Sequence, residues 1–135
     1  MPPAETAAGS CLCGAVGYRV HGSLRPVSTC HCGQCRKTSG HFVAATAADD
    51  GDLQIEDPDG ALTWYRSSSF ARRGFCGRCG SSLFWKRDEA PYTAIMAGTL
   101  DGSTGLRIEA QIFTADKGDY YELDEDIPAF PGSPR

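Results

Sequence analysis

The stretch Thr29-Cys30-His31-Cys32-Gly33-Gln34-Cys35-Arg36-Lys37 places three cysteines within six residues. In a strand, residues two apart point to the same face, so Cys30 and Cys32 can aim at one point. Cys32 and Cys35 then have the C-x-x-C spacing that bends a chain around a metal ion. A structural zinc site is usually closed by four ligands, whereas a reactive site keeps one position for water or substrate. The stretch therefore predicts zinc held by Cys30, Cys32 and Cys35, with the fourth position open to substrate.

The other four cysteines lie in two further motifs with metal-ligand spacing, Cys11-Leu12-Cys13 and Cys76-Gly77-Arg78-Cys79. We predict that these four thiolates form one closed tetrahedral zinc site, which contributes folding free energy directly. The site would close a loop of roughly sixty residues, and closing a long loop restricts the unfolded chain strongly. The chain is thus expected to bind two zinc ions, of which the one at the three-cysteine site is the more labile.

An alternative keeps both sites structural and takes a fourth ligand for the three-cysteine site from His31, His41 or Asp49. If the residues around Cys30 form a strand, the side chain of His31 points away from its two cysteine neighbours. We therefore expect His31 to face solvent or to support the ligands rather than to bind metal. Several cations lie close to the cysteines in sequence and would offset thiolate charge and lower thiol pKa values. They are Arg36, Lys37, Arg72, Arg73 and Arg78.

Length and composition limit the class of protein. A chain of 135 residues is expected to form one domain. Its formal net charge of −4 gives no support to nucleic acid as the main partner. No apolar run is long enough for a membrane span, and the N-terminus lacks the pattern of a secretion signal. Seven cysteines, an odd number in metal-like clusters, indicate a reducing, cytoplasmic location.

The distribution of residue types predicts a mainly β fold of short antiparallel strands with little helix. Gly and Pro, 16 and 8 residues, interrupt the chain every few positions, between short alternating runs of β-branched and aromatic residues. We expect a flexible leader over residues 1–9, a zinc-binding domain over 10–135, and one helical turn at 36–40. The expected strands span residues 15–20, 26–32, 42–47, 53–55, 62–66, 69–75, 82–86, 92–97 and 106–113.

Three motifs in this order resemble the glutathione-dependent formaldehyde-activating enzyme family, which includes centromere protein V-like proteins. They are Gly9-Ser10-Cys11-Leu12-Cys13-Gly14-Ala15-Val16, the stretch from Cys30 to Lys37, and Phe75-Cys76-Gly77-Arg78-Cys79-Gly80-Ser81. The resemblance continues through Gly98-Thr99-Leu100-Asp101 and the segment from Leu123 to Phe130, so it covers nearly the whole chain. It implies a β-tent zinc fold with two zinc ions and a carbon–sulfur lyase activity that joins formaldehyde to glutathione, or reverses that reaction.

The resemblance also implies roles for the cysteines. Cys11, Cys13, Cys76 and Cys79 match the family's structural zinc ligands, and Cys30, Cys32 and Cys35 match its catalytic-type zinc ligands. The chain departs from the family near its C-terminus, where a frequent His is replaced by Gln111 and a Trp by Tyr120. If those two positions shape the substrate pocket, the protein acts on a different substrate.

The expected mechanism follows from three thiolate ligands. Zinc at this site would take a substrate thiol as its fourth ligand and keep it ionised at neutral pH. That thiolate attacks an aldehyde carbon, while Arg36 or Lys37 receives a carboxylate of a peptide-like thiol such as glutathione. The alternative is a non-enzymatic zinc module for protein interaction or for sensing thiols or metals, with aromatic residues near Trp64, Trp85, Tyr120 and Tyr121 as its surface.

Overall fold

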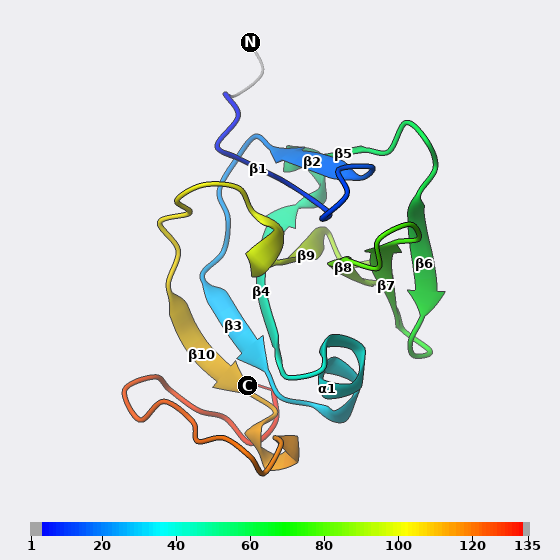
Figure 1. Ribbon diagram of the computed structural model, residues 1–135. Coiled ribbons are helices and arrows are strands. Elements are labelled where there is room, and N and C mark those ends of the chain that lie inside the picture. The colour runs from blue at the N-terminus through cyan, green and yellow to red at the C-terminus, as the bar shows by residue number, and fades with distance from the viewer. Residues whose placement is uncertain (1–3, 134–135) are drawn as a thin grey trace. The chain divides into compact units, whose positions relative to one another are not determined.

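The protein is mainly β in the computed structural model, which describes residues 4–133 (Figure 1). Its chain divides into two compact units, one with residues up to Arg25 and Thr46–Gly105, the other with Pro26–Ala45 and residues from Leu106 onward. The strands are β1 (Ala7–Ser10), β2 (Gly17–Val20), β3 (Val27–Cys30), β4 (Val43–Asp49), β5 (Leu53–Glu56), β6 (Leu62–Arg66), β7 (Ala71–Cys76), β8 (Ser82–Arg87), β9 (Tyr92–Met96) and β10 (Ile108–Ile112). The helices are α1 (Gly33–Ser39) and the 3-10 turns η1 (Asp50–Asp52), η2 (Ala97–Thr99) and η3 (Thr114–Asp116).

The first unit contains two sets of antiparallel strands. One is the sheet β1-β2-β5, and in the other β9, β8, β7 and β6 follow one another. Strand β2 buries one face and exposes the other, because Tyr18 and Val20 are buried while Arg19 between them is exposed. The ring of Tyr18 meets that of Phe84 edge-on, with centroids 5.5 Å apart. Each such buried side chain stabilises the fold by about 1.5–3 kcal/mol, so this contact is a main part of the core.

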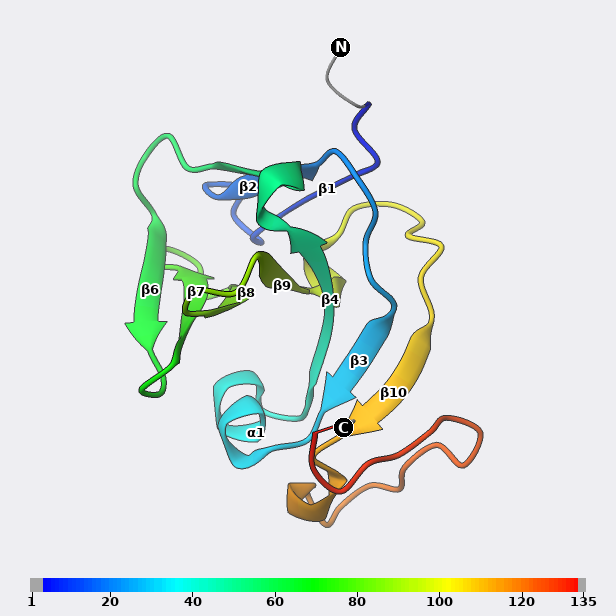
Figure 2. The same cartoon turned by 180° about the vertical axis from the view of Figure 1, so that it is seen from behind.

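In the second unit, β3 lies between β10 and the first residues of β4 (Figures 1 and 2). The pair β10–β3 is parallel, with Gln111 opposite Thr29 and Ile112 opposite Cys30. We expected antiparallel strands, and this pair differs from that expectation. A parallel pair needs a long crossover connection, and here residues 46–105 of the other unit separate the two strands in sequence. The C-terminal segment then returns along β10, where Ala129 bridges to Gln111.

The expected strands are all present, with ends within two residues of the predicted ones. Residues 36–39 of the expected helical turn belong to the longer helix α1, and Gly40 is its C-cap. The structure differs at the start of the chain, where Ala7–Ser10 form β1 and pair with β2 although a leader was expected over residues 1–9. Residues 1–3 of that leader lie outside the described part, and the domain over 10–135 stays a prediction. Within residues 4–133, no helix has the length and apolar character needed to cross a membrane.

Candidate metal centres

Four cysteines of the first unit meet although two of them lie far from the others in sequence. The sulfur atoms of Cys11, Cys13, Cys76 and Cys79 all lie within 4.8 Å of one another. Those of Cys11 and Cys13 are 3.7 Å apart, and so are those of Cys13 and Cys76. Cys11 and Cys76 are buried, whereas Cys13 is exposed, so the group lies at the edge of the core. The structure thus brings together the four residues that the sequence predicted as one site.

Two tight turns present these thiols. In each turn a glycine after the second cysteine donates its backbone N–H to the carbonyl of the first: Gly14 to Cys11 and Gly80 to Cys76. Both glycines have a positive φ, +81° and +80°, which other residues rarely adopt. The turns also aim backbone N–H groups at the sulfurs, from Val16 to Cys11 and from Arg78 and Cys79 to Cys76. Such donors stabilise thiolates, which are the form that binds metal.

The electrostatics of the four thiols are uneven. A side-chain hydrogen bond with Ser81, helped by backbone donors, lowers the pKa of Cys79 to about 5. For Cys13, a backbone donor at Ala15 lowers the pKa, but burial and the three neighbouring sulfurs outweigh it and raise the pKa to about 11. A thiolate at Cys79 therefore makes ionisation of the Cys13 thiol unfavourable unless a cation lies between them. This is the behaviour expected of a donor set that ionises fully with a bound metal ion.

The second unit holds the other three thiols at the junction of β3 and α1. The sulfur atoms of Cys30, Cys32 and Cys35 lie within 4.8 Å of one another. Cys32 is the N-cap of α1, has extended backbone angles, and accepts the backbone N–H of Cys35 at 3.3 Å. A hydrogen bond with Cys35 and burial raise the pKa of Cys30 above its usual value. A strand end, a cap and the first helical turn thus gather the predicted triad.

Within residues 4–133, no histidine or acidic residue joins the three thiols. His31 is only 2% exposed, so the first of its two expected positions, facing solvent, is wrong. Both of its ring nitrogens are hydrogen-bonded to hydroxyls, those of Thr29 and Tyr121, at 3.0 and 2.5 Å. Of the two expected positions, that of a residue supporting the cysteines therefore remains. His41 bonds through Nδ1 to Tyr120 at 2.6 Å.

Four of the five cations near the cysteines fall into two kinds. Arg78 pairs with Asp59 at 3.2 Å, and the guanidinium of Arg72 lies 4.5 Å from the ring centroid of Trp64, as ordinary surface cations do. Arg36 and Lys37 are in the last turn of α1 and form no ion pair within residues 4–133. The Nε atom of Arg36 is buried without a hydrogen-bond partner in that part of the chain. Positive charge therefore stays available beside Cys35.

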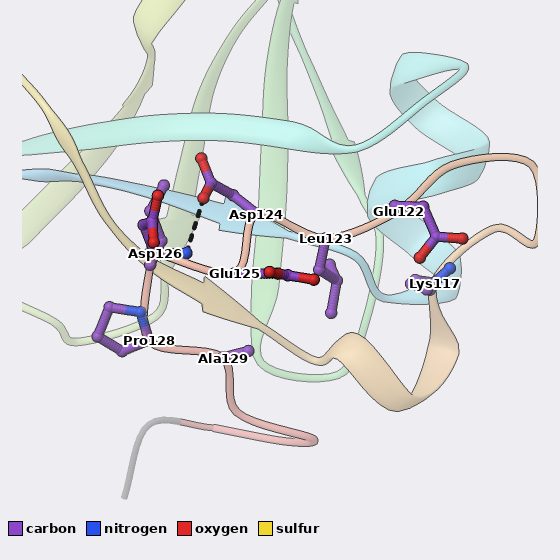
Figure 3. A pocket seen from close by; sticks show the side chains of 9 residues that line it. Lys117, Glu122, Leu123, Asp124, Glu125, Asp126, Pro128 and Ala129 are labelled. Atoms are coloured by element: carbon purple, nitrogen blue, oxygen red, sulfur yellow. Dashed lines mark hydrogen bonds between the residues drawn. The ribbon is translucent and has the colours of Figure 1, made fainter.

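The donor chemistry fits metal ions at both groups. None of the seven cysteines, which all lie within residues 4–133, is part of a disulfide, and their sulfurs cluster tightly enough for one ion to reach every member of a group. Thiolate sulfur is a preferred ligand of zinc. A separate hollow of about 670 Å³ opens in the C-terminal segment among Lys117 and residues 122–129 (Figure 3). Its lining includes four acidic residues and no cysteine, so it is not part of either group.

Sequence reasoning missed two supporting contacts. The Ser81 hydroxyl lies 3.2 Å from Cys79 Sγ and accepts the backbone N–H of Leu12, so it links the two turns of the first group. Its position directly after the Cys76–Gly80 turn was the signal that could have revealed it. The contact of Tyr121 with His31 joins residues 90 positions apart, and no local pattern indicates it.

The chain is similar in sequence and fold to known proteins. A 32% identical protein of Schizosaccharomyces pombe, described as an uncharacterized lyase, matches over 91% of this chain and 87% of its own length. A putative glutathione-dependent formaldehyde-activating enzyme of Halomonas elongata is 35% identical over 56% of this chain and 53% of its own length. A crystal structure of a Rhodobacter sphaeroides protein, 28% identical, superposes with a TM-score of 0.59 over 73% of this chain and 91% of that one.

Most of the chain also matches a known protein family. Residues 6–116 match the family described as glutathione-dependent formaldehyde-activating enzyme, a range that contains all seven cysteines. The fold, the two thiol groups and the lyase-named relative are consistent with that match. The chain belongs to the glutathione-dependent formaldehyde-activating enzyme family.

Proposed function

We propose that the protein is a zinc-dependent carbon–sulfur lyase that forms or cleaves the adduct of formaldehyde with a thiol such as glutathione. The observation that carries the proposal is the group of Cys30, Cys32 and Cys35, three mutually close thiols without a fourth protein ligand within residues 4–133. Three protein ligands are typical of catalytic zinc sites, whose remaining position receives water or substrate. The group of four thiols would hold a second, structural zinc ion.

The chain's own residues would divide the work as follows. Cys30, Cys32 and Cys35 would hold the ion, which when bound lowers the pKa of a coordinated thiol and keeps it nucleophilic. Arg36 and Lys37, which have no acidic partner within the described residues, would receive a carboxylate of the substrate and orient its thiol. In the forward direction the substrate sulfur bonds to the aldehyde carbon, and the proton lost from the thiol ends on the carbonyl oxygen. Cleavage reverses both transfers.

The decisive experiment measures adduct formation and metal content on the same sample. Purified protein is mixed with formaldehyde and, in turn, glutathione, cysteine and 2-mercaptoethanol, and the rate is compared with that of the uncatalysed reaction. We expect acceleration that is greatest for glutathione, because it has two carboxylates for Arg36 and Lys37. A protein with two zinc ions per chain that accelerates none of these reactions contradicts the proposal. The non-enzymatic zinc module would then be the better description.

A further inference from the structure

At the C-terminal end of β3, the two faces of the strand carry different side chains. Thr29 and His31 are two residues apart, bond to each other, and are 3% and 2% exposed. Cys30 lies between them in the strand, so its side chain leaves from the opposite face. The buried imidazole therefore lies directly behind the backbone that carries Cys30 and Cys32. Contacts that hold His31 in place therefore also restrain the backbone from which these two thiols extend.

His31 is held on every side that the structure describes. Its backbone N–H donates to the Ile112 carbonyl at 3.0 Å, and its ring nitrogens bond to the hydroxyls of Thr29 and Tyr121. Its ring also packs on those of Phe42 and Tyr121, with centroids 4.9 and 5.6 Å away. A buried imidazole that loses one of these hydroxyls leaves an unsatisfied polar nitrogen, which is costly enough to make the ring move.

Tyr121 is itself held by the C-terminal segment. Lys117 donates from Nζ to the carbonyls of Gly118 and Tyr121, at 3.0 and 2.7 Å, which closes the turn before Tyr121. Farther along, the buried Gln111 side chain donates to the carbonyls of Asp124 and Ile127 and accepts the backbone N–H of Asp124. All polar atoms of that amide side chain are thus used to fasten the segment to β10. This assigns a physical role to the position where the sequence departs from the family pattern.

We propose that Tyr121 is a positioning residue for the thiol group of Cys30, Cys32 and Cys35, acting through His31. The proposal rests on the metal-binding part of the proposed function, but not on its reaction. With the Tyr121 hydroxyl in place, the three thiols are arranged before an ion arrives. Without it, the turn between Cys30 and Cys32 gains freedom that must be lost again on metal binding. Mutation of residues that support metal ligands without binding the metal typically changes metal affinity by tenfold or more.

The chain offers a matched control at the neighbouring residue. Tyr121→Phe removes the hydroxyl that bonds to the buried His31, whereas Tyr120→Phe removes one that bonds to the exposed His41. Both changes delete one oxygen atom from the same segment, and both leave the aromatic ring. Thr29→Val removes the hydroxyl at the other nitrogen of His31 with little change of shape, and so tests the same role from the other side.

The test follows zinc release from the zinc-loaded protein to a chromogenic chelator, with no substrate present. We expect two phases in the wild type, the faster from the group of three thiols. Tyr121→Phe and Thr29→Val should accelerate the faster phase by about tenfold and leave the slower phase unchanged. Tyr120→Phe should leave both phases unchanged. The slower phase reports the four-thiol group of the other unit, so it separates positioning from general loss of stability.

Three results overturn the proposal: a faster phase in Tyr121→Phe within twofold of wild type, equal acceleration by Tyr120→Phe, or equal acceleration of both phases. If Tyr121→Phe does not fold, Thr29→Val decides by the same criteria. A protein with the expected release pattern but without thiol–aldehyde activity overturns the proposed reaction and leaves this proposal standing. A stoichiometry of one zinc ion per chain overturns both.

Discussion

The sulfur atoms of Cys13 and Cys76 lie 3.7 Å apart, although 63 positions separate the two residues in the chain. Close by, the backbone N–H of Leu12 donates to the Ser81 hydroxyl at 3.0 Å, so the two cysteine turns also meet through a side chain. A metal ion bound to this group would replace weak thiol contacts by strong bonds across a long loop. Disrupting the four-thiol group therefore tests its contribution to folding rather than to the reaction.

The first prediction concerns Cys76→Ser. Cys76 is fully buried and accepts two backbone N–H groups, so its loss removes one of the four thiols that we propose to bind the structural zinc ion. We expect insoluble protein, or soluble protein that melts at a clearly lower temperature and has lost its more tightly held zinc. Soluble yield, melting temperature and zinc content measure this. A soluble variant that melts like wild type would show that the group does not contribute to folding.

The second prediction concerns Cys32→Ser, which serves as the counterpart. Serine is a good N-cap, so its hydroxyl can accept the Cys35 backbone N–H and keep α1 in place. We expect a melting temperature near that of wild type together with loss of thiol–aldehyde turnover, because one metal ligand is gone. Both quantities are measured on one preparation. Wild-type turnover in this variant, or loss of its fold, would remove the triad from the catalytic role.

The third prediction uses two glycines on paired strands. Gly9 lies against Tyr18 and Thr99, and a Cβ atom there would overlap the Tyr18 hydroxyl and the Thr99 carbonyl. At Gly17 the nearest atom to a Cβ is the Gly9 carbonyl oxygen at 3.5 Å, an ordinary contact. We expect Gly9→Ala to lower the free energy of unfolding by about 1–3 kcal/mol. Gly17→Ala should have a much smaller effect in the same urea titrations, and equal losses would contradict the close approach at Gly9.

The fourth prediction concerns acid stability. Burial raises the pKa of Asp50, but hydrogen bonds from Lys86 at 2.6 Å and Thr93 at 2.7 Å outweigh it and lower the pKa below its usual 3.8. A carboxyl with a lowered pKa in the folded state stabilises the protein above its unfolded-state pKa and loses that contribution as the pH falls through the folded-state pKa. Stability should therefore decline below about pH 4.

Asp50→Asn should remove part of that decline, because the variant side chain does not titrate. The control is Asp88→Asn, whose carboxylate pairs with Arg66 at 2.9 Å between two half-exposed side chains. Solvent screens that pair more than the pair with Lys86, which is 17% exposed. The readout is the midpoint of urea unfolding as a function of pH. A profile for Asp50→Asn identical to that of wild type would contradict the role of Asp50.

Much of this protein could be predicted from local patterns. Alternation of apolar and polar residues located the strands, since burying one face of a strand depends on neighbours two positions apart. The spacings of Cys11 with Cys13, Cys76 with Cys79, and Cys30 with Cys35 predicted the thiol groups, because cysteines two or three positions apart in a turn can reach the same ion. The division of seven cysteines into four and three matches the groups that the structure forms.

Contacts between distant segments were decided by the tertiary structure alone. The parallel pairing of β10 with β3 places Gln111 opposite Thr29, and neither strand's sequence specifies its partner. The burial of His31 depends on a tyrosine 90 positions away. The alternation of residues along the strand predicted which way the His31 side chain points, but not which residues cover it. Local sequence determined which residues can bind metal, because that depends on side-chain chemistry and short spacing. Tertiary packing decided what holds those residues in place, because burial and hydrogen-bond partners come from chain segments that meet only in the fold.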